Sequence, residues 1–123
     1  MLAAVSSHAD ATSYAQILKE RDSVLSQILA DRESRRSSGT ADEDAISAAQ
    51  LALYSFRRDT AATTAEKIKN QELIIRVHEK KLEFVKAEKR AGTAAGIQVL
   101  EATAPLLEAK QVLEELRLTD KKG

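Results

Sequence analysis

The feature that most constrains this chain is a long stretch without a helix-breaking residue. Neither glycine nor proline occurs between Ala41 and Ala91, where alanine, leucine, glutamate, lysine and arginine are common. These residues favour helix, and an unbroken helix of this length would extend over about 75 Å. The stretch begins with acidic residues and ends with Lys89 and Arg90, as the helix dipole favours. The sequence therefore predicts an all-α fold around a central helix at residues 41–91.

The central stretch has one weak segment. Its apolar positions run through Ile46, Leu53 and Phe56, but the spacing changes between Thr63 and Ile68. Residues 59–64 are also poor helix formers, and a displaced apolar seam changes the face that packs. We expect a change of packing partner, a bend or a break at residues 59–66.

A shorter helix is predicted on each side of the central one. The first covers residues 9–36, with apolar side chains at helical spacing. These are Tyr14, Leu18, Leu25 and Ile28, with Ile17 and Val24 beside them. Gly39 then interrupts the pattern, and Thr40 followed by Glu43 has the spacing of a capping box.

The third helix is predicted at residues 97–118, after a reversal at Gly92. Its apolar residues alternate in steps of three and four, which is a heptad pattern. They are Val99, Ala102, Leu106, Ala109, Leu113 and Leu116. Pro105 predicts a kink near Ala102 or a later start of the helix, and residues 119–123 are expected to be disordered.

Together these patterns predict a single helical domain over residues 1–123. Apolar residues make up 43% of the chain but many are alanine, so narrow seams are expected rather than a thick core. We expect an elongated antiparallel helical hairpin or coiled-coil bundle. In it, one shorter helix packs along residues 42–66 and the other along residues 67–91.

Composition points away from catalysis and cofactor binding. The chain has no cysteine, which excludes disulfides and thiolate sites, and its two histidines, His8 and His78, lack a ligand pattern. No phosphate-binding loop or nucleophile motif is present. We therefore predict no enzyme, no catalytic residue, no cofactor and no metal. Zero net charge and 3% aromatic residues weigh against a nucleic-acid partner, and no segment is long enough to predict a membrane span.

Residues 92–117 resemble the periplasmic helical hairpin of the TolC family of outer-membrane efflux proteins. The resemblance rests on the following positions: Gly92-Thr93, Val99-Leu100, Ala102-Thr103, Leu106, Ala109-Lys110, Leu113 and Arg117. It extends less specifically over residues 42–118. The chain departs from the family at Gln98, where the family usually has Asp, at Pro105, and in having one helical repeat where the family has two.

The resemblance implies an adaptor-like protein partner and a setting in the periplasm or cell envelope. In the family the hairpin tip meets helical hairpins of adaptor proteins. The corresponding residues here are Gly92, Thr93, Gly96, Gln98 and Val99. The alternative is that these small and polar residues simply form a tight turn between two helices.

Self-association is a further expectation. Four apolar residues lie beside the main seam of the central helix and are predicted to form a homo-oligomer face: Leu73, Ile74, Val77 and Phe84.

Two other functions remain open. One is a cytosolic coiled-coil adaptor or secretion-stalk protein. The other is a weak nucleic-acid-binding helical protein, which the basic residues between Lys67 and Arg90 would favour. The first residues, up to Ala9, resemble the end of a secretory signal, which would favour the envelope. The alternative is that they form a frayed terminus.

Overall fold

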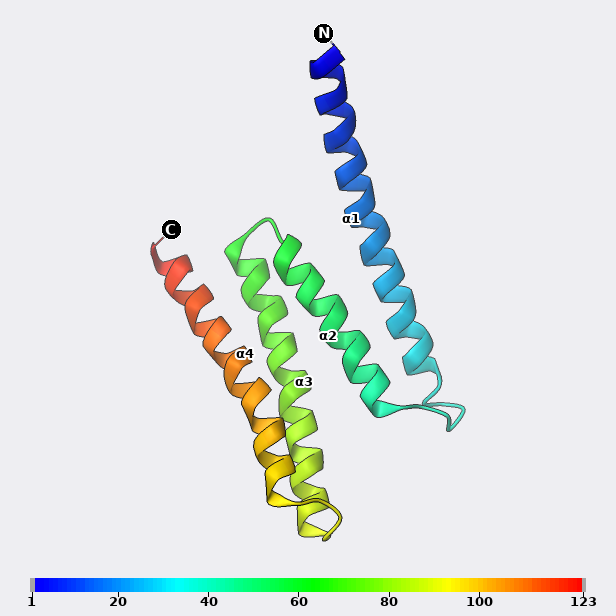
Figure 1. The fold of residues 1–123 in the computed structure, drawn as a ribbon, viewed down its shortest axis with the longest axis vertical. Helices are drawn as coiled ribbons and strands as arrows, with labels where there is room; N and C mark the ends of the chain where they lie inside the picture. The colour runs from blue at the N-terminus through cyan, green and yellow to red at the C-terminus, as the bar shows by residue number, and fades with distance from the viewer. Residues whose placement is uncertain (1, 123) are drawn as a thin grey trace. The chain divides into compact units, whose positions relative to one another are not determined.

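In a computed structural model of the protein, the backbone is described for residues 2–122 and the side-chain surroundings for residues 12–121. Four α-helices follow one another in this range (Figure 1): α1 (Leu2–Ser34), α2 (Glu43–Thr60), α3 (Thr64–Arg90) and α4 (Gly96–Lys122). The predicted all-α class is confirmed. The chain divides into two compact units, Met1–Ala49 and Gln50–Gly123, and the division falls within α2.

The long central helix is interrupted where its seam shifts. Of the three possibilities at residues 59–66, the structure has a break, because α2 ends at Thr60 and α3 begins at Thr64. Thr63 is extended, with φ −127° and ψ 153°, and its Oγ1 accepts a hydrogen bond from the Glu66 amide at 3.2 Å. The prediction of one continuous helix from its charged ends is wrong. Each helix has its own acidic first turn and basic last turn.

The outer helices are longer than predicted. α1 begins at Leu2 rather than near residue 9, and ends at Ser34. α4 continues to Lys122, so the expected disorder of residues 119–122 is wrong, and Gly123 lies outside the described residues. Pro105 neither delays nor ends α4. A proline leaves the carbonyl four residues before it without its helical partner, and here that residue, Glu101, is exposed, where water can bind the carbonyl.

In the first unit, a glycine turn joins α1 to α2. Gly39 has φ +74°, and the amides of Gly39 and Thr40 donate to the carbonyls of Arg36 and Arg35 at 3.2 and 3.0 Å. This pair of bonds closes a helix end in the Schellman manner. Among residues 12–49, whose side-chain surroundings are described, Leu29 of α1 and Ile46 of α2 are the largest buried apolar side chains.

The predicted cap of the second helix is wrong by two residues. Asp42, not Thr40, is the cap, because Asp42 Oδ1 accepts from the amides of Asp44 and Ala45 at 3.0 and 3.1 Å. Glu43 forms an ion pair with Arg36, with Nη2 and Oε2 3.0 Å apart.

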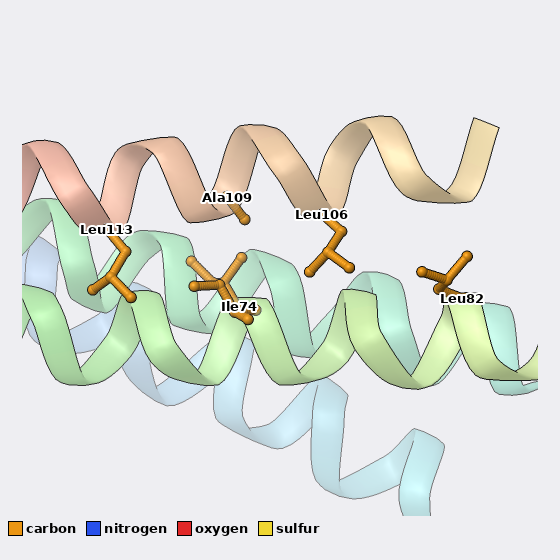
Figure 2. Packing of buried hydrophobic residues seen from close by; sticks show 6 residues of the cluster. Ile74, Leu82, Leu106, Ala109 and Leu113 are labelled. Atoms are coloured by element: carbon orange, nitrogen blue, oxygen red, sulfur yellow. The ribbon is translucent and has the colours of Figure 1, made fainter. Parts of the chain in front are cut away.

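In the second unit, α3 and α4 pack side by side and form the main core (Figure 1). The buried cluster consists of Ile74, Ile75, Leu82, Leu106, Ala109 and Leu113 (Figure 2). Val99 and Ala102 of α4, Ile68 of α3, and Leu51 and Tyr54 of α2 are partly buried against it. The heptad seam predicted for the third helix is thus the face that α4 presents to α3.

Candidate interaction surface

The first candidate surface is the turn between α3 and α4. Gly92 has φ +82°, and its amide donates to the Lys89 carbonyl at 3.0 Å. The Thr93 amide donates to the Glu88 carbonyl at 2.9 Å, and Thr93 Oγ1 bonds the same carbonyl at 3.1 Å. The two amide bonds repeat the geometry of the Gly39 turn. The positive φ explains why glycine occupies position 92.

The start of α4 is held by Gln98. The side-chain Oε1 of Gln98 accepts a hydrogen bond from the main-chain amide of Ala95 at 2.7 Å. The main-chain amide of Gln98 donates to the Ala95 carbonyl at 3.0 Å. This is the backward half of a capping box, in which the third helical residue binds the residue at the cap. Gln98 therefore has a structural role that does not need a partner.

The structure brings the five predicted tip residues together at this turn. Gly92, Thr93, Gly96 and Gln98 are exposed, whereas Val99 is half-buried and packs against the core cluster. The tight-turn interpretation accounts for Gly92, Thr93 and Gln98 through the bonds described above. The exposed backbone of the glycines still leaves room for a close helical contact.

The predicted homo-oligomer residues do not form one exposed face. Ile74 is buried in the core cluster with α4, and Val77 is also buried. Leu73 is half-buried, and only Phe84 is exposed, at 65%. Helical spacing places these residues beside the seam but does not determine which of them other helices of the chain bury.

A second apolar face lies on α4, opposite its packed seam. Ile97, Leu100, Leu107 and Leu118 are 58–64% exposed. With exposed Ala104 they occupy positions a and d of a heptad that is distinct from the packed one. Positions 111 and 114 of this second heptad are Gln111 and Glu114. We call Ile97, Leu100, Ala104, Leu107 and Leu118 the outer face of α4.

The outer face has a sequence signal that the predicted seams do not include. The same helix contains two runs of apolar residues in alternating steps of three and four, and only the longer run was read as a seam. A helix that packs on a core needs only one such run. The second run therefore indicates a surface that could bind a partner.

Charges flank the outer face with opposite signs. Glu101, Glu108 and Glu115 occupy the first three e positions on one side, and Lys122 occupies the fourth. The g positions on the other side are Gly96, Thr103, Lys110 and Arg117. Within α4, Arg117 Nη1 pairs with Glu114 Oε1 at 2.7 Å, and Gln111 donates to Glu115 at 3.0 Å. The charged groups among residues 101–117 are all exposed.

The first unit has an exposed apolar face as well. Tyr14, Ile17, Val24 and Ile28 of α1 are exposed, contrary to the expectation that they pack on the central helix. A shallow hollow on this face is lined by Ile17, Arg21 and Val24 together with Glu20 and Leu25.

Metal-ligand groups and buried polar atoms are the features that bear on chemistry among the described residues. Among them, no group of three or more His, Asp or Glu side chains is placed to hold a metal ion. Every buried side-chain nitrogen or oxygen among them has a hydrogen-bond partner. Partial burial, and then the nearby Lys81, lower the pKa of His78 below its ordinary 6.5, and Glu108 of α4 opposes this shift. His78 is thus a half-buried residue at the edge of the α3–α4 contact.

Over the part of the chain whose placement is described, none of the helices combines the length and the apolar character needed to cross a bilayer. No family model matches the chain, and no characterised protein or solved structure is significantly similar to it.

Proposed function

We propose that this chain is a non-enzymatic interaction protein that acts by helix–helix association. The observation that carries the proposal is the outer face of α4, where large apolar side chains at heptad spacing remain exposed. A contiguous exposed apolar stripe is costly in water and is characteristic of a surface that another helix covers. The exposed apolar face of α1 supports the same kind of association.

The TolC-like interpretation adds a setting and a partner to this proposal. Two packed helices joined by a short glycine turn are what a reduced TolC-type hairpin would contain. On this interpretation the chain works in the bacterial envelope or in a secretion assembly, and its tip meets a helical adaptor. Exposed Gly92, Thr93 and Gly96 would allow such a close approach.

A coiled-coil adaptor of the cytosol is the second candidate. The exposed α1 face favours it, because this surface lies outside the segment that resembles the TolC hairpin. Such an adaptor would bind through α1 and would not need the tip.

The experiment is site-specific photo-crosslinking in cells that produce the full chain. A photoreactive amino acid is placed at Leu100 on the outer face, at Thr93 at the tip, and at Ile17 on α1. Exposed Glu79 of α3 is the control position. We expect a discrete crosslinked product at Leu100; products at Thr93 or Ile17 would favour the tip or the α1 interpretation, respectively. If no position exceeds the Glu79 control, the proposed function is wrong.

A further inference from the structure

We propose that the outer face of α4 binds the same face of a second copy of this chain, with the two α4 helices parallel. This inference rests on the proposed function, because it names the partner of the face on which that function depends. This face differs from the homo-oligomer face predicted from the sequence, in which Ile74 and Val77 are buried.

The apolar positions define how two copies meet. In a two-stranded coiled coil, positions a and d of each helix meet the equivalent positions of the other. Here they contain Ile97, Leu100, Ala104 and Leu107 in succession, all exposed. The core seam lies on the other side of α4, so a second helix can cover the outer face without displacing α3.

The flanking charges identify the partner as a second copy. In a parallel pair, position g of one helix lies beside position e of the next heptad on the other helix. Lys110 then lies beside Glu115 of the partner copy, and the two-fold symmetry repeats the pair. The Lys110–Glu115 pair is attractive and forms twice, whereas the fourth e position, Lys122, falls beside Arg117. In the parallel arrangement no glutamate at an e position faces another glutamate at an e position.

The same charges disfavour the antiparallel arrangement. There, e positions face e positions and g positions face g positions. With Ile97 near Leu118 of the partner copy, Glu101 would face Glu115. Glu108 and Lys110 would each face their own equivalents, and Arg117 would face Thr103. Like charges in contact oppose association, so the pattern selects one direction.

Two polar residues set the strength of the association. Gln111 at an a position would meet its own equivalent, and a polar pair at such a position fixes register at a cost in stability. Glu114 at a d position would also meet its equivalent, although Arg117 offsets its charge at 2.7 Å. We therefore expect a dimer that depends on protein concentration and that strengthens when Glu114 is replaced by leucine.

The absence of cysteine makes the arrangement testable by disulfide mapping on the full chain. Ile97→Cys and Leu118→Cys are prepared separately and oxidised with copper–phenanthroline. In a parallel pair each variant forms a disulfide with itself. In an antiparallel pair equivalent ends lie about 30 Å apart, so only a mixture of the two variants would crosslink. Self-crosslinking of both variants supports the proposal, and crosslinking of the mixture alone overturns it.

Solution mass measured by analytical ultracentrifugation provides the second readout. Leu100→Asp should weaken the dimer by about 100-fold, because two exposed leucines lose their contact. Phe84→Asp, an equally exposed apolar residue off this face, should leave it unchanged. Lys110→Glu should weaken the dimer about fivefold at low salt, and adding Glu115→Lys should restore it.

These outcomes separate the two proposals. If the wild-type chain stays monomeric while Leu100 still photo-crosslinks to a different protein, self-association is overturned and the proposed function stands. If Phe84→Asp abolishes the dimer and Leu100→Asp does not, the proposed face is wrong.

Discussion

The side-chain amide of Gln71 donates a 2.8 Å hydrogen bond to the main-chain carbonyl of Ala109, linking α3 to α4 across 38 residues. The same amide accepts a 2.8 Å bond from Arg58 Nη1 near the end of α2. Gln71 is only 1% exposed, so both polar ends of its amide are satisfied inside the second unit. Apolar seams tolerate slippage, whereas one satisfied polar contact of this kind defines a register.

Replacing Gln71 with alanine should therefore destabilise the second unit. The change leaves a small cavity and deprives Arg58 of a buried partner, and we expect a loss of about 2–3 kcal/mol in the free energy of unfolding. Urea denaturation followed by far-UV circular dichroism measures this loss. Asn70→Ala is the matched control, since Asn70 Nδ2 donates to the Glu66 carbonyl of its own helix. Equal stability of the two variants would refute the role given to Gln71.

The two glycines of the α3–α4 turn should respond differently to the same substitution. Gly92 has φ +82° and nothing within 4 Å of an added Cβ, so Gly92→Ala adds backbone strain without a clash. We expect it to cost about 1 kcal/mol of unfolding free energy. Gly96 begins α4, and an added Cβ there would meet only the flexible Lys89 Nζ at 3.9 Å. Gly96→Ala should be neutral or stabilising. A larger loss at Gly96, measured by thermal unfolding, would show that the turn depends on close packing instead.

The packed seam of α4 was predictable because it follows one period. Leu106, Ala109 and Leu113 recur at heptad spacing, and this spacing alone determines that they share a face. Gln71 was not predictable in this way, because its two partners come from distant segments. Spacing also does not reveal whether other helices of the same chain bury a given face. Val77 and Phe84 lie on a shared stripe, yet one is buried and the other exposed.

Helix ends were predictable only in part, because competing caps have similar sequences. Thr40 and Glu43 have the same spacing as Thr63 and Glu66, but only Thr63 acts as a cap. Near Thr40, the carboxylate of Asp42 accepts hydrogen bonds from two amides, so Asp42 is the N-cap of α2. A weak helical segment and a shifted seam predicted a change of packing partner, a bend or a break at residues 59–66, and the structure has a break. The residue that caps α3 after this break, Thr63, was not predicted.

Removal of that cap should loosen the start of α3. Thr63→Ala removes the acceptor of the Glu66 amide, and we expect a loss of about 1 kcal/mol in unfolding free energy. Thr63→Ser keeps the hydroxyl and should retain nearly all of the stability. Amide hydrogen exchange at Glu66 provides a local readout, because its protection depends on the 3.2 Å bond to Thr63 Oγ1. Unchanged exchange in the alanine variant would contradict the assignment of this cap.

Stability should fall as the medium becomes mildly acidic, through His78. Partial burial and Lys81 lower the pKa of His78 below 6.5 in the folded chain, with Glu108 opposing them. The unfolded chain therefore takes up the proton first as pH falls through about 6.5, and uptake by the unfolded state reduces stability. The stability that neutral His78 contributes is fully present above about pH 6.5. It declines as the pH falls from there to the pKa of His78 in the folded chain.

The measurement compares the wild type with His78→Gln by urea denaturation at about pH 7.5 and pH 5.5, above the range in which most carboxylates titrate. The wild type should lose stability over this interval, and the variant should lose less. NMR titration of the His78 ring gives the folded pKa directly. A wild type that gains stability on acidification would show that attraction to Glu108 outweighs burial at the α3–α4 contact.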